Sequence, residues 1–184
     1  MTIPNYITFF RLSLVPLFCI VVFLYSPERT ELRYVALGIY AVGGISDMLD
    51  GFIARRWNLR SQLGVRLDPL ADKLLINLGF IFVAANDAFE PNFPKWFPAL
   101  VLARDVYIVM GAYLIKRLAG HLVVRPKILG KITTFSLMVT LIAALLGLPF
   151  TLYLMAISIV FAVGSFLEYT VDGILQVYSR NATP

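Results

Sequence analysis

The sequence has few charged residues, one cysteine and one histidine. Charged residues make up 15% and hydrophobic residues 59% of the 184 positions, whereas a soluble domain is about 25% charged and about half apolar. This composition excludes a water-soluble globular domain. It also excludes a disordered chain, because disordered segments are poor in hydrophobic residues. Cys19 cannot form an internal disulfide, and with His121 as the single histidine no zinc site of cysteines and histidines can form.

Six apolar stretches, separated by short polar or proline-containing segments, account for almost the whole length. Each is long enough for a bilayer-spanning helix, which takes about 20 residues. We therefore predict one domain over residues 1–184, an all-α integral membrane protein with six transmembrane helices in one bundle. The first stretch is expected to be a retained helix, because Arg11 interrupts it and no cleavage site follows. The predicted helices cover residues 6–26, 33–56, 64–86, 95–117, 128–147 and 149–177.

Basic residues are distributed unequally between the two sides of the predicted bundle. Ten lysines and arginines flank the helix ends on the side that holds both termini, and three flank the other side. Because basic loops stay in the cytoplasm, we expect both termini and the segments 56–64 and 117–128 to be cytoplasmic. The net charge of +5 favours anionic membrane lipid as a partner. The sequence offers no basic, aromatic-rich soluble surface for a nucleic acid.

Four aspartates lie inside the second and third apolar stretches. Asp47 and Asp50 are three residues apart and Asp68 and Asp72 are four apart, so each pair shares one face of a helix. An aspartate in the bilayer costs about 2.5–3.5 kcal/mol on the insertion scale, so such residues indicate a functional site. The short connection makes the two helices antiparallel. Counted from the connecting loop, Asp50 and Asp68 are then expected at the same depth in the membrane. Asp47 and Asp72 are expected together about one helical turn deeper.

Two kinds of site explain these converging carboxylates. Mg²⁺ is typically held by a few carboxylates together with waters and substrate phosphates, and two ions about 3.5–4 Å apart suit an in-line phosphoryl displacement. The alternative is an ion or proton transporter whose pathway uses the same acids. That alternative predicts acids spread across the membrane, whereas these four gather in the cytoplasmic half of two adjacent helices.

Residues 47–72 read DMLDGFIARRWNLRSQLGVRLDPLAD and fit the pattern D-x2-D-G-x2-A-R-x8-G-x3-D-x3-D at all eight fixed positions. This pattern resembles the signature of the CDP-alcohol phosphotransferases, integral membrane enzymes of phospholipid synthesis. Other segments are similar to the branch of that family that makes phosphatidylglycerophosphate or cardiolipin. They are Pro4-Asn5 with Thr8, Arg11 and Pro16, then Asp68 to Leu75, Gly130-Lys131 with Thr133, and Glu168-Tyr169.

The resemblance implies a six-helix homodimer in the inner membrane, with its active site open to the cytoplasmic interface. It implies two divalent cations, Mg²⁺ or Mn²⁺, and CDP-diacylglycerol as the donor. Asp72 would also act as the general base, and Arg55 would contact the diphosphate. The implied metal ligands are Asp47, Asp50, Asp68 and Asp72, and the implied CDP-binding residues are Asn5, Thr8, Arg11, Asp47, Gly51, Ala54, Arg55 and Gly64.

A second group of polar residues predicts the acceptor site. Arg104 lies well inside an apolar stretch and needs an anion. Asp105 is an unfavourable partner, because adjacent residues on a helix point about 100° apart, and a substrate phosphate suits an arginine fork better. Glu168 and Asp172 form an acidic pair that is expected to anchor nearby cations, a helix seam or, less favourably, substrate. The residues expected to bind the acceptor are Arg104, Arg125, Lys127 and Lys131. Internal ion pairing is the alternative for Arg104 and Lys131, and topology alone also explains Arg125 and Lys127.

The basic residues point to a phosphate-bearing acceptor, for which we favour glycerol 3-phosphate, with phosphatidylglycerophosphate and CMP as products. Arg104-Asp105-Val106 is instead similar to the CDP-diacylglycerol-dependent cardiolipin synthases, whose acceptor is phosphatidylglycerol. Phosphatidylglycerol therefore remains the alternative acceptor, and inositol phosphate a third.

Overall fold

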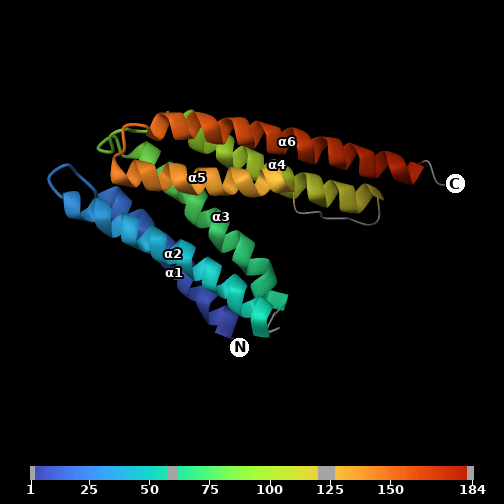
Figure 1. Cartoon of the computed structure of the whole chain (residues 1–184), viewed down its shortest axis with the longest axis horizontal. Coiled ribbons are helices and arrows are strands. Elements are labelled where there is room, and N and C mark those ends of the chain that lie inside the picture. Colours follow the sequence, from blue (N-terminus) through green and yellow to red (C-terminus); the bar gives the residue numbers. More distant parts are fainter. Residues whose placement is uncertain (1–2, 58–61, 120–126, 182–184) are drawn as a thin grey trace. The chain divides into compact units, whose positions relative to one another are not determined.

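The computed structural model is helical throughout the part of the chain that it describes. It describes the backbone of residues 3–57, 62–119 and 127–181, and the side chains of residues 9–46, 73–115, 117, 127–176 and 178. Within these residues there are six helices and no strand, as hydropathy predicts. The helices are α1 (Ile3–Leu24), α2 (Thr30–Trp57), α3 (Gln62–Ala85), α4 (Trp96–Ala119), α5 (Ile128–Leu146) and α6 (Thr151–Asn181) (Figure 1).

The chain divides into two compact units that share α5. The N-terminal unit comprises Met1–Lys95 and Leu141–Pro149, and the C-terminal unit comprises Trp96–Thr140 and Phe150–Pro184. Helix α5 therefore begins in the C-terminal unit and ends in the N-terminal unit.

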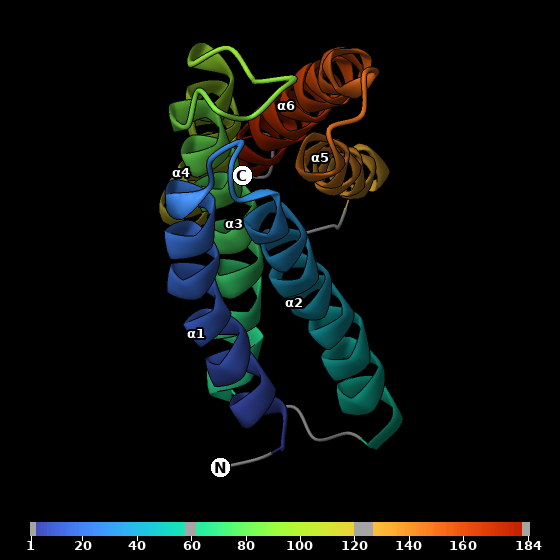
Figure 2. The same cartoon turned by 90° about the vertical axis from the view of Figure 1, so that its left-hand side faces the viewer.

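In the N-terminal unit, α1 packs against both α2 and α3, and α2 also contacts α3 (Figure 2). The rings of Phe18 and Tyr40, both buried, lie 5.9 Å apart between α1 and α2. Asn86 follows α3, and its amide nitrogen donates to the carbonyls of Val22 at 2.8 Å and Tyr25 at 3.0 Å. These bonds tie the C-terminal end of α3 to the C-terminal end of α1, so the relative heights of the two helices are fixed.

Arg33 near the start of α2 holds the last turn of α5 within the N-terminal unit. Its Nε donates to the carbonyl of Leu145 at 2.8 Å, and its Nη2 donates to the carbonyl of Ala144 at 2.7 Å. The last carbonyls of a helix have no partner inside the helix. Arg33 supplies the missing donors, and its positive charge lies where the helix dipole favours a cation.

In the C-terminal unit, α4 packs against α6. The rings of Tyr107 and Phe166 lie 4.4 Å apart, and the Tyr107 hydroxyl is 3.0 Å from the Thr170 hydroxyl. Between α5 and α6, the hydroxyls of Thr140 and Ser158 form a buried hydrogen bond of 3.0 Å. Such polar contacts between helices stabilise helix association in apolar surroundings.

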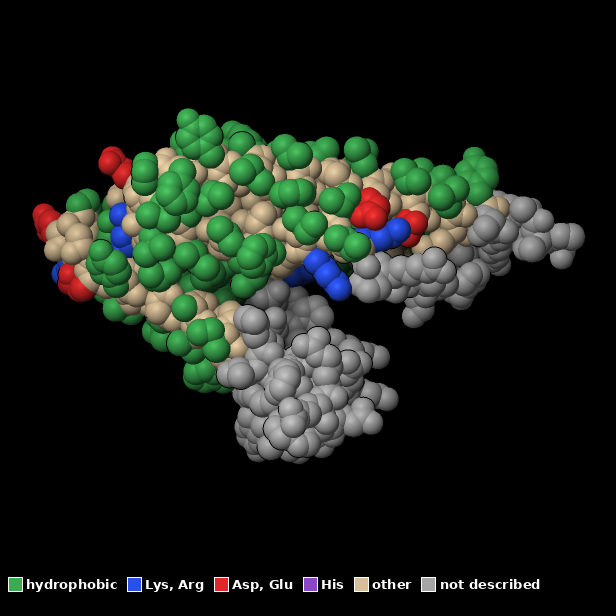
Figure 3. Space-filling view, viewed as in Figure 1, with side chains coloured by type: hydrophobic (Ala, Val, Ile, Leu, Met, Phe, Trp, Pro, Cys, Tyr) green, Lys and Arg blue, Asp and Glu red, His purple; other side chains and the backbone are tan. Residues whose placement is uncertain are grey.

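Several helices have the length and composition of membrane spans. Among the described residues three qualify fully, namely Trp96–Ile115, Ile128–Leu146 and Thr151–Gln176, and shorter apolar helices cover Phe9–Leu24 and Lys73–Ala85. Figure 3 shows many hydrophobic side chains on the described part of the visible face, including much of α6. Soluble monomers rarely expose apolar patches larger than a few hundred Å², so these helices indicate a membrane protein.

Candidate functional site

The signature segment lies on α2 and α3, in the N-terminal unit. The backbone is helical in both parts of the signature, whereas the side chains of residues 47–72 lie outside the described residues. Counted from the adjoining ends of α2 and α3 at 1.5 Å per residue, Asp50 and Asp68 lie about 10 Å along their helices, and Asp47 and Asp72 about 15 Å. The backbone thus gives the four aspartates matching heights, and the convergence of their carboxylates stays a prediction.

Helices α2 and α3 approach each other closely just beyond the aspartates. A Cβ atom on Gly43 would lie 2.7 Å from Cδ2 of Leu75, which is itself only 3% exposed. Gly43 lies about one turn before Asp47, and Leu75 about one turn after Asp72. The absence of a side chain at Gly43 therefore allows the two signature helices to touch next to their innermost aspartates. Gly43 could not be predicted from the sequence, because a glycine in an apolar helix does not reveal which neighbour it faces.

Arg11 on α1, expected to bind CDP, is completely buried within the N-terminal unit. Arg11 precedes the end of α1 by 13 residues, and Asp72 precedes the end of α3 by 13 residues. Because Asn86 ties these two helix ends together, Arg11 and Asp72 lie at about the same height, about 20 Å from those ends. A buried guanidinium needs anionic or hydrogen-bonding partners, so its position fits an anionic site. Asn5 and Thr8 lie outside the described side chains.

In the C-terminal unit, Arg104 is held by two oxygen atoms from two helices. Its Nη1 donates to Oδ1 of Asp105 at 2.8 Å, and its Nη2 donates to Oγ of Ser165 on α6 at 2.8 Å. The side chains of Arg104 and Asp105 are 9% and 14% exposed. The expectation that Asp105 is an unfavourable partner is wrong, because the long arginine side chain bends back across the angle between neighbouring residues. Ser165, which is fully buried, was not predicted as a partner of Arg104 from the sequence.

Helix α5 approaches this cluster at Gly130. A Cβ atom on Gly130 would lie 3.1 Å from the hydroxyl oxygen of Tyr169 and 3.6 Å from Oγ of Ser165. Lys131, expected at the acceptor, follows Gly130 and is exposed on α5. Helix α4 thus supplies an arginine and a carboxylate, α6 supplies hydroxyl groups, and α5 approaches them closely through Gly130.

Lys127, just before α5, forms two ion pairs with α6. Its Nζ lies 2.9 Å from Oδ2 of Asp172 and 3.9 Å from Oε1 of Glu168. Figure 3 shows one group of basic and acidic side chains toward the right of the described surface and further charged side chains at its left end. The expectation that Glu168 and Asp172 anchor a nearby cation is confirmed for Lys127. Arg125 lies outside the described residues.

A hollow of about 310 Å³ adjoins Arg104. We call it the α4–α6 hollow. Arg104 contributes its one charged side chain, and the rest of the lining is apolar or aromatic. The other lining residues are Leu100, Ala103, Tyr107, Ala162, Val163 and Phe166.

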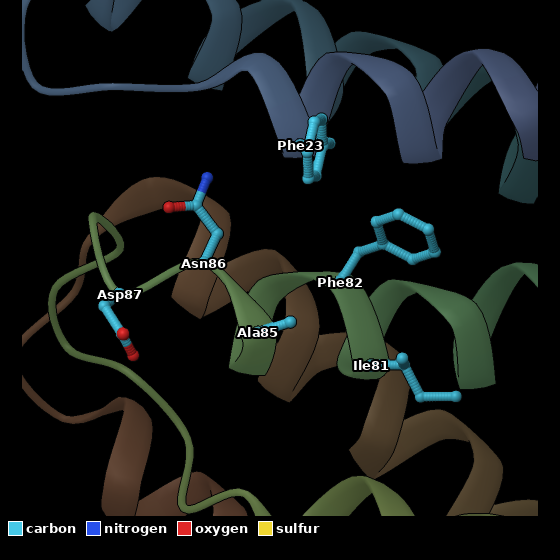
Figure 4. A pocket seen from close by; sticks show the side chains of 6 residues that line it. All are labelled: Phe23, Ile81, Phe82, Ala85, Asn86 and Asp87. Carbon is cyan, nitrogen blue, oxygen red and sulfur yellow. The ribbon is translucent and has the colours of Figure 1, made fainter.

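A second hollow, of about 360 Å³, lies at the C-terminal end of α3 in the N-terminal unit. Figure 4 shows Phe23 pointing from α1 toward α3, where Phe82 lies near it, while Asp87 points away. The lining residues Ile81, Ala85 and Asn86 complete it. Ala85 follows Asp72 by 13 residues, or about 20 Å of helix, so this hollow is remote from the signature.

Among the described side chains, no group of three or more histidine, cysteine, aspartate or glutamate residues is arranged to hold a metal ion. The four aspartates expected as metal ligands lie outside that part of the chain. Their carboxylates are the chemical type that hard divalent cations prefer.

Comparison with known proteins gives both a family and named relatives. The human cardiolipin synthase (CMP-forming) is 36% identical over 116 residues, which is 62% of this chain and 35% of the human protein. The Streptomyces coelicolor protein of that name is 35% identical over 138 residues, 75% of this chain and 62% of its own length. The match therefore spans about a third of the human relative and less than two thirds of the bacterial one.

Another named relative is covered over most of its length. The Bacillus subtilis CDP-diacylglycerol–glycerol-3-phosphate 3-phosphatidyltransferase is 32% identical over 160 residues, which is 82% of this chain and 80% of that protein. Residues 1–164 match the family model described as CDP-alcohol phosphatidyltransferase. This match confirms the resemblance drawn from the signature, and the chain belongs to the CDP-alcohol phosphatidyltransferase family.

Proposed function

We propose that this protein transfers a phosphatidyl group from CDP-diacylglycerol to a hydroxyl of glycerol 3-phosphate, forming phosphatidylglycerophosphate and CMP. The observation that carries the proposal is the complete signature, placed on two helices that touch at Gly43 and Leu75 beside its innermost aspartates. Membership of the family favours a transferase over the ion or proton transporter.

We assign the donor to the N-terminal unit. Arg55 neutralises the diphosphate of CDP-diacylglycerol, and Gly51, Ala54 and Gly64 leave room for the nucleotide. Asn5, Thr8, Arg11 and Asp47 complete the CDP-binding set. Asp72 takes the proton from the acceptor hydroxyl. A bond forms between that oxygen and the phosphatidyl phosphorus, while the bond from phosphorus to the CMP oxygen breaks.

The four aspartates Asp47, Asp50, Asp68 and Asp72 are proposed to hold two divalent cations, Mg²⁺ or Mn²⁺. Members of this family generally depend on divalent metals, and paired carboxylates at matching heights fit such ions. When bound, the cations supply charge neutralisation at the transferring phosphate. Titration of CMP release with each metal measures which of the two ions the protein prefers.

We assign the acceptor phosphate to Arg104 in the C-terminal unit, with Lys127, Lys131 and Arg125 as further cations. An arginine fork suits phosphate, and the α4–α6 hollow offers space next to it. The second candidate function is a cardiolipin synthase with phosphatidylglycerol as acceptor. The apolar lining of the α4–α6 hollow favours that candidate, because a lipid acceptor carries acyl chains.

We further propose that all six helices span the inner membrane in one functional domain of residues 1–184. Both termini and the active site then face the cytoplasm, in accordance with the distribution of basic residues. A homodimer is the proposed assembly. Cross-linking in native membranes, combined with cysteine labelling from each side, tests the assembly and the orientation.

The function is tested by CMP release from purified protein in detergent with CDP-diacylglycerol and Mg²⁺ or Mn²⁺. Glycerol 3-phosphate and phosphatidylglycerol are supplied in separate reactions. We expect release that depends on metal and is stimulated by glycerol 3-phosphate. Stimulation by phosphatidylglycerol alone supports the second candidate. Absence of release with either acceptor contradicts the proposed function.

A further inference from the structure

We propose that Ser165 is a positioning residue whose hydroxyl holds the Arg104 guanidinium in the orientation that binds the acceptor phosphate. The inference rests on the proposed function, in which Arg104 binds that phosphate. Ser165 itself is assigned no contact with substrate.

The geometry around Arg104 carries the inference. Ser165 is fully buried on α6, and its Oγ accepts from Nη2 of Arg104 at 2.8 Å. On the other side, Oδ1 of Asp105 accepts from Nη1 at 2.8 Å. The guanidinium is therefore fixed at two nitrogens by oxygens from two helices. Without Ser165 it is held from the side of Asp105 alone and gains rotational freedom.

The donors that remain on Arg104 suit a phosphate. A guanidinium has five N–H groups in a fixed plane, and Asp105 and Ser165 use one each. Nε is buried and has no hydrogen-bond partner among the described residues. Three N–H groups therefore remain on the guanidinium, and neighbouring guanidinium donors bind two oxygens of a phosphate at once. Arg104 also lines the α4–α6 hollow, which gives an anion space beside it.

The surroundings of Ser165 restrict its hydroxyl to this task. Gly130 on α5 comes so close that an added Cβ would be 3.6 Å from Ser165 Oγ and 3.1 Å from the Tyr169 hydroxyl. The hydroxyl is thereby confined between α4 and α5. A serine packed merely for its small size needs no bond to an arginine 61 positions away.

The test separates the Michaelis constant for the acceptor from turnover, with whichever acceptor stimulates CMP release. Ser165→Ala is expected to raise the acceptor KM about tenfold, which corresponds to about 1.4 kcal/mol. The kcat and the KM for CDP-diacylglycerol are expected to change less than twofold. Ser165→Thr restores the hydroxyl and is expected to return the acceptor KM to near the wild-type value.

Ser158→Ala is the matched control. Ser158 is also fully buried on α6, two turns before Ser165, and its hydroxyl bonds to Thr140. This variant is expected to lower thermal stability and to leave the acceptor KM unchanged. Equal increases in the acceptor KM in both serine variants overturn the proposal, because loss of packing then explains them.

Arg104→Lys separates failure of this inference from failure of the proposed function. If Arg104→Lys raises the acceptor KM and folded Ser165→Ala does not, the role of Ser165 is wrong and the acceptor site stands. If neither variant changes that KM, the assignment of the acceptor phosphate to Arg104 is wrong, and the role of Ser165 with it. If the wild-type protein releases no CMP, the proposed function itself is wrong.

Discussion

The two units place their polar residues by different means. In the N-terminal unit, eight signature positions fall within residues 47–72 on two consecutive helices. In the C-terminal unit, Arg104 bonds to a residue 61 positions away, and Lys127 pairs with acids on the last helix. Helical periodicity therefore predicts how the signature aspartates pair, and the resemblance of the signature implies the donor, whereas the acceptor site depends on which helices pack together. Four predictions test this contrast.

The largest expected effect is the loss of turnover in Asp72→Asn. Loss of a general base typically costs about 10²–10⁴-fold in rate, and we expect kcat for CMP release to fall within that range. Asp87→Asn is the control, because Asp87 is exposed, 3.8 Å from Lys95, and remote from the signature. More than a tenth of wild-type turnover in folded Asp72→Asn would exclude Asp72 as the base.

The next effect separates the substrates of the two units. Arg104→Lys keeps the charge and loses the planar fork, so we expect the acceptor KM to rise about tenfold, or about 1.4 kcal/mol, with the donor KM unchanged. Arg55→Lys is expected to do the reverse. Initial rates measured with each substrate varied in turn give both constants. A rise in the donor KM of Arg104→Lys would contradict the assignment of the donor to the N-terminal unit and of the acceptor to the C-terminal unit.

A smaller effect is expected where the signature helices touch. Gly43→Ala places a Cβ 2.7 Å from Leu75, and such overpacking typically destabilises by about 1–3 kcal/mol. Gly38→Ala is the matched control on the same helix, because its Cβ meets nothing within 4 Å. Gly38→Ala is expected to be neutral or to stabilise by up to about 1 kcal/mol. Thermal unfolding in detergent gives the Tm of both variants. Equal Tm values would contradict the close approach of α2 to α3 at Gly43 and Leu75.

The smallest effect is expected at Lys127. Its ion pairs with Asp172 and Glu168 are partly exposed, with side chains 20–34% accessible, and such pairs contribute about 0–1 kcal/mol. Lys127→Met is therefore expected to change the free energy of unfolding by less than about 1 kcal/mol. It is expected to raise the acceptor KM less than Arg104→Lys does. A larger rise would make Lys127 the main phosphate ligand.

Much of the fold could be predicted from the sequence, because long apolar runs predict membrane helices. All six expected helices are present, with ends that differ by a few residues. The largest extension is at the end of α6, which continues to Asn181 instead of ending near residue 177. Hydropathy shows which residues are apolar, whereas the end of a helix is set by its backbone hydrogen bonds, which can continue past the last apolar residue.

The candidate site could be predicted only where spacing along one helix carries the information. The signature spacing gives the aspartate pairs and their expected heights. It does not give the contact of Gly43 with Leu75, the complete burial of Arg11 or the bond from Arg104 to Ser165. Each of these depends on the rotation of one helix against another, and a single sequence does not contain that rotation.

The hydrogen bonds of Arg33 determine when, during synthesis, the N-terminal unit can complete its packing. Its acceptors, the carbonyls of Ala144 and Leu145, follow it by 111 and 112 residues. Chains emerge from the ribosome N-terminus first. The hydrogen bonds from Arg33 to these carbonyls therefore cannot form until α5 has been synthesised. The whole signature is translated by residue 72, yet the unit that carries it completes its packing only when most of the polypeptide exists. Phosphatidyl transfer is therefore expected to begin late in biogenesis, after the fifth helix has joined the first three.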